Sequence, residues 1–391
     1  MNKHQPGQPL KVALIASCDY DPNAGVAGAT VSLAAALKEK GAVCDTFFMD
    51  DLKTFTGNVL DDLLFPLKVA LLKRKFSTYD VLEIATGDSW VLSLLPGRPV
   101  IIANSHGLEN VAHDNRVMEA REGRLKLSWK YTFYHGGFRL WQEKVAFRRA
   151  DAALLLNGQD LKYAVNRLGV PSSKAYQVSN GIRSSFMNLP FEEIAPGSSE
   201  PIRIACVGSY IPRKGIVYSV PALNRLLKRT DHVSVSFIGT RAEADAVLKD
   251  FDASVHSRIQ VIPKYDQPNL PSLLKGHQIL LFPSLSEGSP LTLLEAMACG
   301  TAPVVTDIPG INDTVTDGLD ALVVPARSSE AIELALKQLL SDDRLRRKLR
   351  QNAYITAQRY SWDNVAEARL SLYTSLLEKR RGSQEAFAAY R

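Results

Sequence analysis

Two glutamates in the stretch PSLSEGSPLTLLEAMACG, residues 283–300, have a spacing that could bind a ligand carrying both phosphate and hydroxyl groups. Glu287 and Glu295 are separated by seven residues. Residues 291–298 are apolar helix formers and the run ends at Gly300, which places Glu295 in a helix and Glu287 in the loop before it. Free amides at a helix N-terminus suit a diphosphate, and carboxylates suit the hydroxyls of ribose and hexose. The alternative is an ordinary amphipathic helix with two solvated glutamates.

Two adjacent cations form the second candidate group. Arg213 and Lys214 lie in VGSYIPRKG, directly after a predicted strand and before a helix that begins near residue 216. Fixed cations at such a point can hold a diphosphate, and they stabilise a leaving phosphate more than the ground state because negative charge grows on it as the bond breaks. Arginine offers a bidentate fork and lysine a point charge, so the two roles need not be equal. Two solvated loop cations are the alternative.

The first half of the chain offers weaker candidates. Gly25 and Gly28 in PNAGVAGAT would let the backbone approach a phosphate at the start of a helix, although the spacing is not G-x-G-x-x-G and a flexible turn is the alternative. His106 follows the apolar strand PVIIANS, at the strand end where ligands bind in such sheets. Glu109 and Asn110 follow it and could bind acceptor hydroxyls. A structural or solvated histidine is the other interpretation of His106.

These residues lie on a repeated pattern of strands and helices. The first half opens with the apolar strand LKVALIAS, and the second restarts with IRIACVGS at residues 202–209. Continuous apolar runs alternating with helical patterns predict an α/β fold with two doubly wound parallel-sheet domains. The polar, proline-containing segment 191–201 predicts a linker between them. Two such domains facing each other would form a ligand-binding cleft.

Six ordered motifs resemble those of the large family of retaining GT-B-fold glycosyltransferases known as glycosyltransferase family 4. The longest match is nearly continuous over about forty residues that include both glutamates. The motifs are NAGVAGA, SHGLE near residue 106, VSNGI near 180, VGSYIPRKG near 210, EGSPLTLLEAMACGTAPVVTDIPGINDTVTDGLDALVVP, and YSWDNVAEARLSLY near 365. Because these matches keep the family's order over most of the chain, the resemblance implies the GT-B fold along its length.

The resemblance also implies roles for individual residues. Glu295 would hold the ribose of a nucleotide sugar, Glu287 the hydroxyls of the donor sugar, and the amides of Leu291 and Thr292 the phosphates. His106 would lie near the donor sugar or the acceptor. The glycine loop at 25–28 would face the diphosphate and the acceptor, so we include it in donor binding. With Arg213 and Lys214, His106 and Glu287 form the predicted catalytic set.

One position departs from the family pattern. The family often has an arginine directly after the strand glycine, where this chain has Ser209 next to Gly208. More of the positive charge that would hold the diphosphate must therefore come from Arg213 and Lys214. The implied activity is metal-independent transfer of a hexose, with retention, from a nucleotide diphosphate sugar to a glycan or lipid-linked acceptor. The implied domains are residues 1–190 on the acceptor side, joined by a C-terminal helix at about 361–391 that packs back, and residues 201–360 on the donor side.

Composition narrows the class of protein. A chain of 391 residues with 46% hydrophobic residues predicts a two-domain globular protein. No apolar run reaches transmembrane length, and the N-terminal sequence lacks a signal-peptide pattern, so we expect a cytoplasmic protein that could associate peripherally with the inner face of a membrane. The four scattered cysteines favour reduced thiols. Asp19 and Asp21 have D-x-D spacing, but with two cations covering the leaving group we expect no metal and no other cofactor.

A basic, aromatic segment between residues 116 and 149 is the last distinctive feature. Its nine cations oppose three glutamates, a surplus as large as the net charge of +6 for the whole chain. Aromatic residues are interleaved with the cations at positions 129, 131, 133, 134, 138, 141 and 147. Such a segment could meet an anionic membrane or an acidic acceptor, and the alternative is a long helix that buries its aromatic face. No nucleic-acid motif accompanies the charge.

Two other classes of function share the predicted architecture. A sugar-nucleotide epimerase would release free nucleotide without a glycosyl product. A non-catalytic sugar-nucleotide binding protein would keep the binding residues without turnover, and the presence of Arg213, Lys214, Glu287 and Glu295 argues against it.

Overall fold

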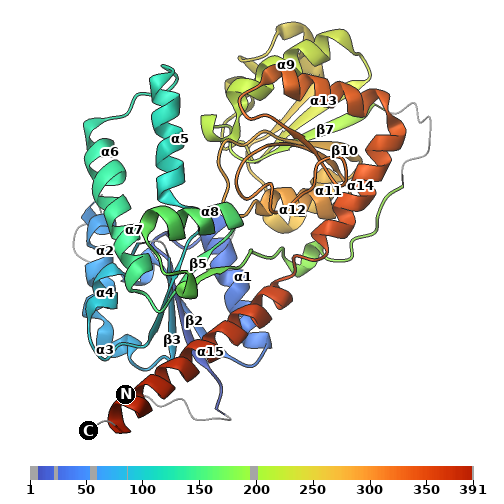
Figure 1. The fold of residues 1–391 in the computed structure, drawn as a ribbon. Helices are drawn as coiled ribbons and strands as arrows, with labels where there is room; N and C mark the ends of the chain where they lie inside the picture. Colours follow the sequence, from blue (N-terminus) through green and yellow to red (C-terminus); the bar gives the residue numbers. More distant parts are fainter. Residues whose placement is uncertain (1–7, 22–24, 53–59, 86, 194–200, 390–391) are drawn as a thin grey trace. The chain divides into compact units, whose positions relative to one another are not determined.

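The computed structural model describes residues 8–21, 25–52, 60–85, 87–193 and 201–389, without the side chains of residues 60–63, 384 and 386–389. The chain divides into two compact units. Residues 1–181 and 362–391 form the first unit, and residues 182–361 form the second (Figure 1). Each unit contains one parallel six-stranded sheet. The predicted class, α/β with two doubly wound parallel sheets, is therefore confirmed.

The sheet of the first unit has the strand order β2-β1-β3-β4-β5-β6, and every pair is parallel. Every residue of β3, β4 and β5 is buried, as expected for strands covered by helices on both faces. The strands are β1 (Lys11–Ile15), β2 (Val43–Phe47), β3 (Val81–Ala85), β4 (Val100–Asn104), β5 (Ala152–Leu155) and β6 (Ala175–Gln177).

The helices of the first unit include one that returns from the far end of the chain. They are α1 (Gly25–Glu39), α2 (Leu60–Leu71), α3 (Lys73–Phe76), α4 (Trp90–Leu94), α5 (Glu109–Arg121), α6 (Trp129–Phe133), α7 (Leu140–Arg149), α8 (Gly158–Tyr163) and α15 (Trp362–Ala389), with π-helical turns at Tyr134–Arg139 and Ala164–Leu168. Segment 116–149 is thus divided among α5, α6, a π-helical turn and α7, and is not one long helix.

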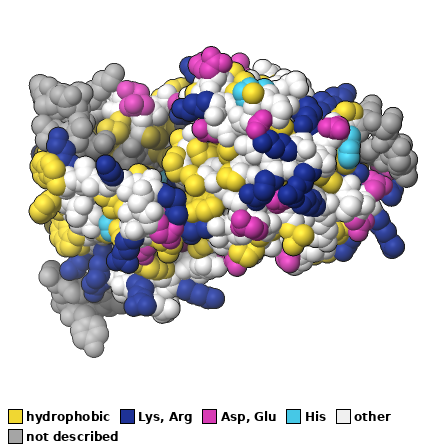
Figure 2. Space-filling model, turned by 90° about the horizontal axis from the view of Figure 1, so that it is seen from above, with side chains coloured by type: hydrophobic (Ala, Val, Ile, Leu, Met, Phe, Trp, Pro, Cys, Tyr) yellow, Lys and Arg dark blue, Asp and Glu magenta, His cyan; other side chains and the backbone are white. Residues whose placement is uncertain are grey.

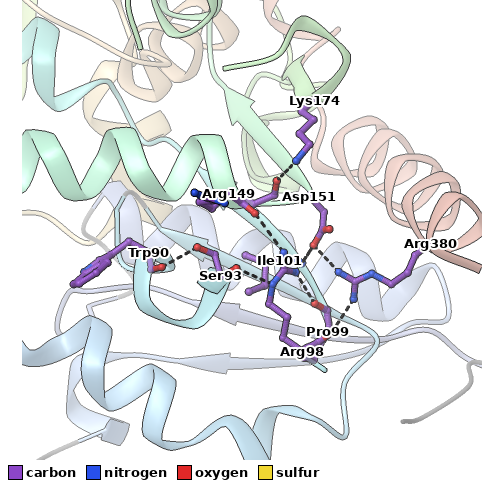
Figure 3. A network of polar contacts seen from close by, with 10 residues as sticks. Trp90, Ser93, Arg98, Pro99, Ile101, Arg149, Asp151, Lys174 and Arg380 are labelled. Carbon is purple, nitrogen blue, oxygen red and sulfur yellow. Dashed lines mark hydrogen bonds and ion pairs between the residues drawn. The ribbon is translucent and has the colours of Figure 1, made fainter. Parts of the chain in front are cut away.

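The C-terminal helix α15 packs on the first unit and is held there by polar contacts. Its Arg380 donates to the Asp151 carboxylate at 2.8 Å and to the Arg98 carbonyl at 2.8 Å (Figure 3). Asp151 also accepts from the Arg98 guanidinium at 2.5 Å and from the Ile101 amide at 2.8 Å. Burial alone would raise the pKa of Asp151, but the charges of Arg98 and Arg380 outweigh it and lower that pKa. Asp151, directly before β5, is therefore one of the residues that hold α15 on the first unit.

The sheet of the second unit has the order β12-β11-β10-β7-β8-β9, again with every pair parallel. Its strands are β7 (Ile202–Val207), β8 (Val233–Ile238), β9 (Ile259–Ile262), β10 (His277–Phe282), β11 (Ala302–Thr306) and β12 (Leu322–Val324). Its helices are α9 (Ile216–Arg229), α10 (Ala244–Leu248), α11 (Leu270–Leu274), α12 (Leu291–Ala298), α13 (Ser329–Ser341) and α14 (Asp343–Ala357). The adjacent strands β7 and β10 lie at its centre and carry the predicted donor-site loops.

The boundary between the units lies earlier than the predicted end of the first domain at residue 190. The first unit ends at Gly181, and the following residues pack on the second unit. The Ile182 amide donates to the Tyr360 carbonyl at 2.7 Å, and Phe186 is fully buried in the core of the second unit. Apolar side chains in this segment therefore join the second core before the polar stretch expected to be a linker, of which residues 194–200 lie outside the described residues.

Candidate functional site

The loops that follow β7 and β10 are joined directly to each other. The Leu285 amide donates to the Arg213 carbonyl at 2.9 Å. Gly215, the N-cap residue directly before α9, has φ +74°, and a Cβ atom there would lie 1.9 Å from the Pro283 carbonyl oxygen. Only glycine fits so close an approach in a left-handed conformation. This contact fixes the short turn Pro212–Lys214 against the loop that carries Glu287.

The two predicted cations meet the predicted loop glutamate. The Lys214 ammonium lies 2.6 Å from Glu287 Oε1, and Arg213 Nη1 lies 3.9 Å from Glu287 Oε2. Lys214 also lies 4.8 Å from the centroid of the Phe282 ring, within the range of a cation–π contact. The Lys214 side chain is 18% exposed and that of Arg213 is 51% exposed. The structure thus brings together three of the four predicted catalytic residues, with Lys214 the more enclosed of the two cations.

A second glycine turn packs directly against the loop that carries Glu287. Gly310 has φ +81°, and a Cβ atom there would lie 2.5 Å from the Gly288 carbonyl oxygen and 2.8 Å from that of Glu287. The Thr306 hydroxyl donates to the Ser284 carbonyl at the start of the same loop. The glycine of the Pro309–Gly310 turn therefore has a defined role, since it allows the chain after β11 to press against the loop after β10.

Glu295 occupies a different environment from Glu287. It lies within α12 and is buried, and its Oε1 accepts a hydrogen bond from the Gln267 side chain. Burial raises the pKa of Glu295 to about 7, while the charge of Arg183 and the Gln267 hydrogen bond act in the opposite direction. This carboxyl group therefore changes its protonation near neutral pH and can accept or donate hydrogen bonds to a ligand hydroxyl.

The start of α12 bears on the predicted phosphate contacts. Leu291 begins the helix after Pro290, which has no amide proton. The Leu291 amide donates to the Ser289 carbonyl at 3.0 Å, so it is not available to a phosphate in this conformation. The loop thus closes on itself before the helix starts, and the predicted phosphate contact of the Leu291 amide, which requires this hydrogen bond to open, stays a prediction. The role of the Thr292 amide stays a prediction.

His106 lies in the first unit beside a small cavity. The cavity has a volume of about 20 Å³, room for about one water molecule, and Asn104, Asn180 and Trp362 also line it. Burial, followed by the charge of Arg369, lowers the pKa of His106 to about 4. The imidazole is therefore neutral at pH 7 and can accept a hydrogen bond on one nitrogen while donating on the other.

Gly25 lies at the start of a helix, as predicted, whereas Gly28 lies inside that helix, and the contact of both with a phosphate stays a prediction. Gly25 is the first residue of α1, and Gly28 is buried within that helix. Neither has a positive φ, and a Cβ atom at Gly25 would meet nothing within 4 Å. The local sequence is helical through both positions, so the backbone freedom of glycine is not used there. Residues 22–24, just before the helix, lie outside the described residues.

The structure adds polar residues that the sequence did not single out. Beneath Asn104, the Glu83 carboxylate accepts from the Asn104 amide at 2.7 Å and from the Tyr373 hydroxyl at 2.5 Å. Arg369, which is 1% exposed, lies 3.7 Å from the same carboxylate. Tyr373 and Arg369 come from α15, far away in sequence. No local pattern of the sequence indicated this contact.

A second buried group lies behind the loop that follows His106. Glu143 of α7 accepts from the Glu109 amide at 3.3 Å and from the Asn110 side chain at 2.9 Å. Burial first, and then the nearby Glu109 charge, raise the pKa of Glu143 to about 8. The Asn110 side chain, predicted to meet an acceptor, is thus bonded to Glu143. The described residues contain no group of three or more His, Cys, Asp or Glu side chains placed to hold a metal ion.

The site in the second unit lies within a segment of the chain that matches a known protein family. Residues 191–356 match the family Glycosyl transferases group 1. Residues 191–356 therefore belong to the group 1 glycosyl transferases. A phosphatidyl-myo-inositol mannosyltransferase of Mycolicibacterium smegmatis is 26% identical over 246 residues, which cover 62% of this chain and 61% of that protein. The alignment thus spans about three fifths of this curated relative. All residues of the Lys214–Glu287 contact lie within the group 1 domain.

Solved structures resemble the chain over nearly its whole length. Sucrose-phosphate synthase from Thermosynechococcus elongatus has a TM-score of 0.74 and 18% identity, covering 94% of this chain and all of that one. Anabaena HepE in complex with UDP-glucose has a TM-score of 0.68 and 15% identity, covering 93% of this chain and all of that one. At these identities the likeness concerns the fold alone. With its group 1 domain, the chain has the GT-B fold.

Proposed function

We propose that the protein is a retaining glycosyltransferase that moves a hexose from a nucleotide diphosphate sugar to a hydroxyl of a glycan or lipid-linked acceptor. The observation that carries this proposal is the contact between Lys214 and Glu287 at 2.6 Å, where the loops after the two central strands of the group 1 domain meet. It joins a phosphate-binding cation and a hydroxyl-binding carboxylate at the strand ends where such sheets bind ligands.

The ion pair leaves Lys214 able to bind a phosphate as well. An ammonium group has three N–H donors, so Lys214 can keep Glu287 and still donate to an oxygen of the diphosphate. As the glycosyl–phosphate bond breaks, negative charge grows on the leaving phosphate oxygen, and a preorganised cation stabilises that charge. The more exposed Arg213 guanidinium adds to the same field. Glu287 then accepts hydrogen bonds from hydroxyls of the donor sugar.

Retention follows from a front-side displacement. The anomeric carbon loses its bond to the leaving phosphate oxygen and gains one to the acceptor oxygen on the same face, and the acceptor proton passes to the leaving phosphate. This course needs no enzymatic nucleophile and no metal, because protein cations cover the leaving group. In the first unit, we assign His106 to the side of the acceptor, where its neutral imidazole can bind a hydroxyl.

Related proteins support a nucleotide-sugar donor. HepE was solved with UDP-glucose, and the M. smegmatis relative is named as a mannosyltransferase that acts on a phosphatidyl-inositol. Both point to hexose transfer, and the second to an acceptor that carries lipid. Glu295 would bind the ribose of the donor from within α12. We place the reaction on the cytoplasmic side of the envelope, in the synthesis of a polysaccharide or glycoconjugate.

The test is product analysis with a panel of nucleotide hexoses and of glycan and lipid-linked acceptors. Mass spectrometry should show an acceptor heavier by one hexose, and release of nucleoside diphosphate should depend on the acceptor. Lys214→Ala should lower both signals by about two to four powers of ten. Lys228→Ala is a matched control, because Lys228 also pairs with a carboxylate, that of Asp252, but at the opposite end of α9.

Two outcomes would overturn the proposal. Free nucleotide and an altered sugar formed without acceptor would indicate an epimerase. Tight donor binding without turnover across the whole panel would indicate a non-catalytic binding protein.

A further inference from the structure

Helix α6 presents two large aromatic side chains to solvent on one face. Trp129 is 70% exposed and Phe133 is 75% exposed, and their ring centroids lie 6.4 Å apart in an edge-on contact. They are four residues apart, so both lie on the same side of the helix. Exposed aromatics that touch each other form a continuous apolar surface, which is unlike the scattered single apolar residues normal for a protein surface.

The opposite side of α6 is already packed. Tyr131 is two residues from each exposed aromatic and therefore faces the other way. Its hydroxyl lies 3.2 Å from His113 Nδ1 of α5, the two rings are stacked with centroids 5.8 Å apart, and the Arg116 guanidinium lies 5.2 Å from the tyrosine ring. Gly136, in the following π-helical turn, approaches the His113 ring so closely that a Cβ atom would lie 2.7 Å from it. These contacts fix which face of α6 points outward.

Exposed cations lie close to the aromatic pair in the sequence, and the Lys130 ammonium is 6.0 Å from the centroid of the Trp129 ring. Arg121, Lys126 and Lys130 are exposed, and none of them takes part in an ion pair within the described residues. The acidic side chains nearby, Glu119 and Glu122, are both paired with Arg124. Figure 2 shows hydrophobic and basic side chains next to each other on its left, the side on which helices of the first unit lie in Figure 1.

The other aromatic residues of the basic aromatic segment are less exposed, with Trp141 at 47% and Phe138 at 38%. Trp141 is in edge-on contact with Trp90 at a centroid distance of 5.1 Å and stacks on Phe138 at 5.6 Å. Phe147 is fully buried in the core of the first unit. The candidate surface therefore reduces to the outer face of α6 and the cations beside it, which we call the α6 surface: Arg121, Lys126, Trp129, Lys130 and Phe133.

We propose that the α6 surface docks on an anionic membrane. Trp129 and Phe133 enter the headgroup region, where amphipathic aromatic rings prefer to lie, and the three cations meet lipid phosphates. No described helix is long and apolar enough to cross a bilayer, so this contact is with the membrane surface. A second copy of the chain fits less well, because a two-fold contact through this surface would place like charges against each other.

The experiment measures vesicle binding by sedimentation with the full-length protein, using phosphatidylcholine vesicles with and without phosphatidylglycerol. The wild type should bind the anionic vesicles at low salt, bind neutral ones weakly, and release as salt rises. Trp129→Ser with Phe133→Ser should lower partitioning about tenfold or more, given the apolar area withdrawn. Arg121→Gln, Lys126→Gln and Lys130→Gln together should remove the preference for anionic lipid.

Matched controls come from exposed residues of the second unit. Leu334→Ser removes an apolar side chain that is 69% exposed, and Lys249→Gln with Lys264→Gln removes two exposed cations. Neither should change vesicle binding. Brominated lipid should quench the wild-type tryptophan fluorescence, and Trp129→Phe should remove most of that quenching while binding persists.

Wild-type protein that ignores anionic vesicles at low salt would overturn the proposal. So would a dimer that becomes monomeric in the Trp129→Ser, Phe133→Ser variant while vesicle binding stays unchanged, because that result would make the surface a contact between copies. Vesicle binding requires no turnover. A failure of the proposed glycosyl transfer would therefore leave this result intact, and the reverse also holds.

Discussion

Replacing Glu295 by glutamine separates the cost of burying its carboxylate from its use in binding. Burial raises the pKa of Glu295 from 4.5 to about 7. The folded state therefore holds the proton more tightly than the unfolded state. Below about pH 4.5 both states are protonated and the carboxyl costs nothing. Between pH 4.5 and 7 the unfolded state loses its proton first, so folding becomes progressively less favourable, and above pH 7 the full cost remains.

The size of this effect follows from the shift. A change from 4.5 to about 7 corresponds to roughly 3 kcal/mol at pH 8. Glutamine has nearly the same shape, stays neutral, and can still accept from Gln267. Glu295→Gln should therefore stabilise the ligand-free second unit by up to about 3 kcal/mol at pH 8 and by little at pH 4.5. For a unit of this size that is roughly 6 to 12 °C in Tm.

Scanning calorimetry at several pH values measures the difference directly. Glu243→Gln is the control, because Glu243 is exposed in the same unit. The same variant should weaken binding of a nucleoside diphosphate in calorimetric titrations, since the ribose loses an anionic acceptor. A Tm difference that does not change between pH 4.5 and pH 8, or a loss of stability at pH 8, would refute the burial argument. Unchanged nucleotide affinity would refute the assignment to ribose.

The remaining predictions concern charge at the site and at the base of α15. Lys214→Ala should lower turnover by about two to four powers of ten, and Arg213→Ala should lower it less because Arg213 is half exposed; equal kinetics to wild type in both would remove them from the mechanism. Glu287→Ala should weaken binding of the intact donor more than binding of the free nucleoside diphosphate, whereas Glu295→Ala should weaken both alike; calorimetry that shows identical losses would contradict this division. Turnover should persist in excess EDTA, and activity lost with EDTA and restored by Mg²⁺ or Mn²⁺ would disprove the metal-free course. Asp151→Asn should destabilise the protein by about 2 to 3 kcal/mol at pH 7 and by less as the pH falls below about 4, because the lowered pKa of Asp151 means that its charged form stabilises the fold. Thermal unfolding at several pH values tests this. An identical loss at pH 3 would show that the shape of the side chain matters and its charge does not.

The sequence was informative wherever a local rule governs the structure. Many of the buried parallel strands are continuous apolar runs, so they could be located from the pattern of apolar residues along the sequence. Helix α12 starts at Leu291, where the apolar run starts, and ends beside Gly300. The loop position of Glu287 and the helical position of Glu295 followed from the same pattern.

Local rules were misleading where packing decided the outcome. Glycine content suggested that a loop extends to Gly28, but the surrounding alanines and the buried face of α1 keep that residue in a helix. One long helix was the alternative for the basic aromatic segment, yet the chain leaves the helix at residues 122–128, between α5 and α6, and Gly136 in the π-helical turn packs against the His113 ring of α5. The amide of Leu291 looked available because no local rule indicates a turn to Ser289.

Contacts between distant segments could not be read from the sequence. Lys214 and Glu287 are 73 residues apart, and Tyr373 and Glu83 are 290 apart. Each pair meets because of the order of the strands in the sheet. A sequence pattern limits the possible strand orders but does not determine which one forms. Arg369 shows the consequence, since its charge acts on His106 from a helix that the chain reaches only after the whole second unit.

The two glutamates of the site are held by different contacts, and this decides which of them a diphosphate reaches in the proposed reaction. Glu287 is held by Lys214 and Arg213, whereas Glu295 is buried and accepts from Gln267. Lys214 would keep Glu287 through one N–H group and donate its other N–H groups to the diphosphate, so the Glu287 carboxylate would stay in place to accept from the sugar hydroxyls. The diphosphate would therefore reach Glu287 through a shared cation, while the position of Glu295 depends on burial and on Gln267 instead.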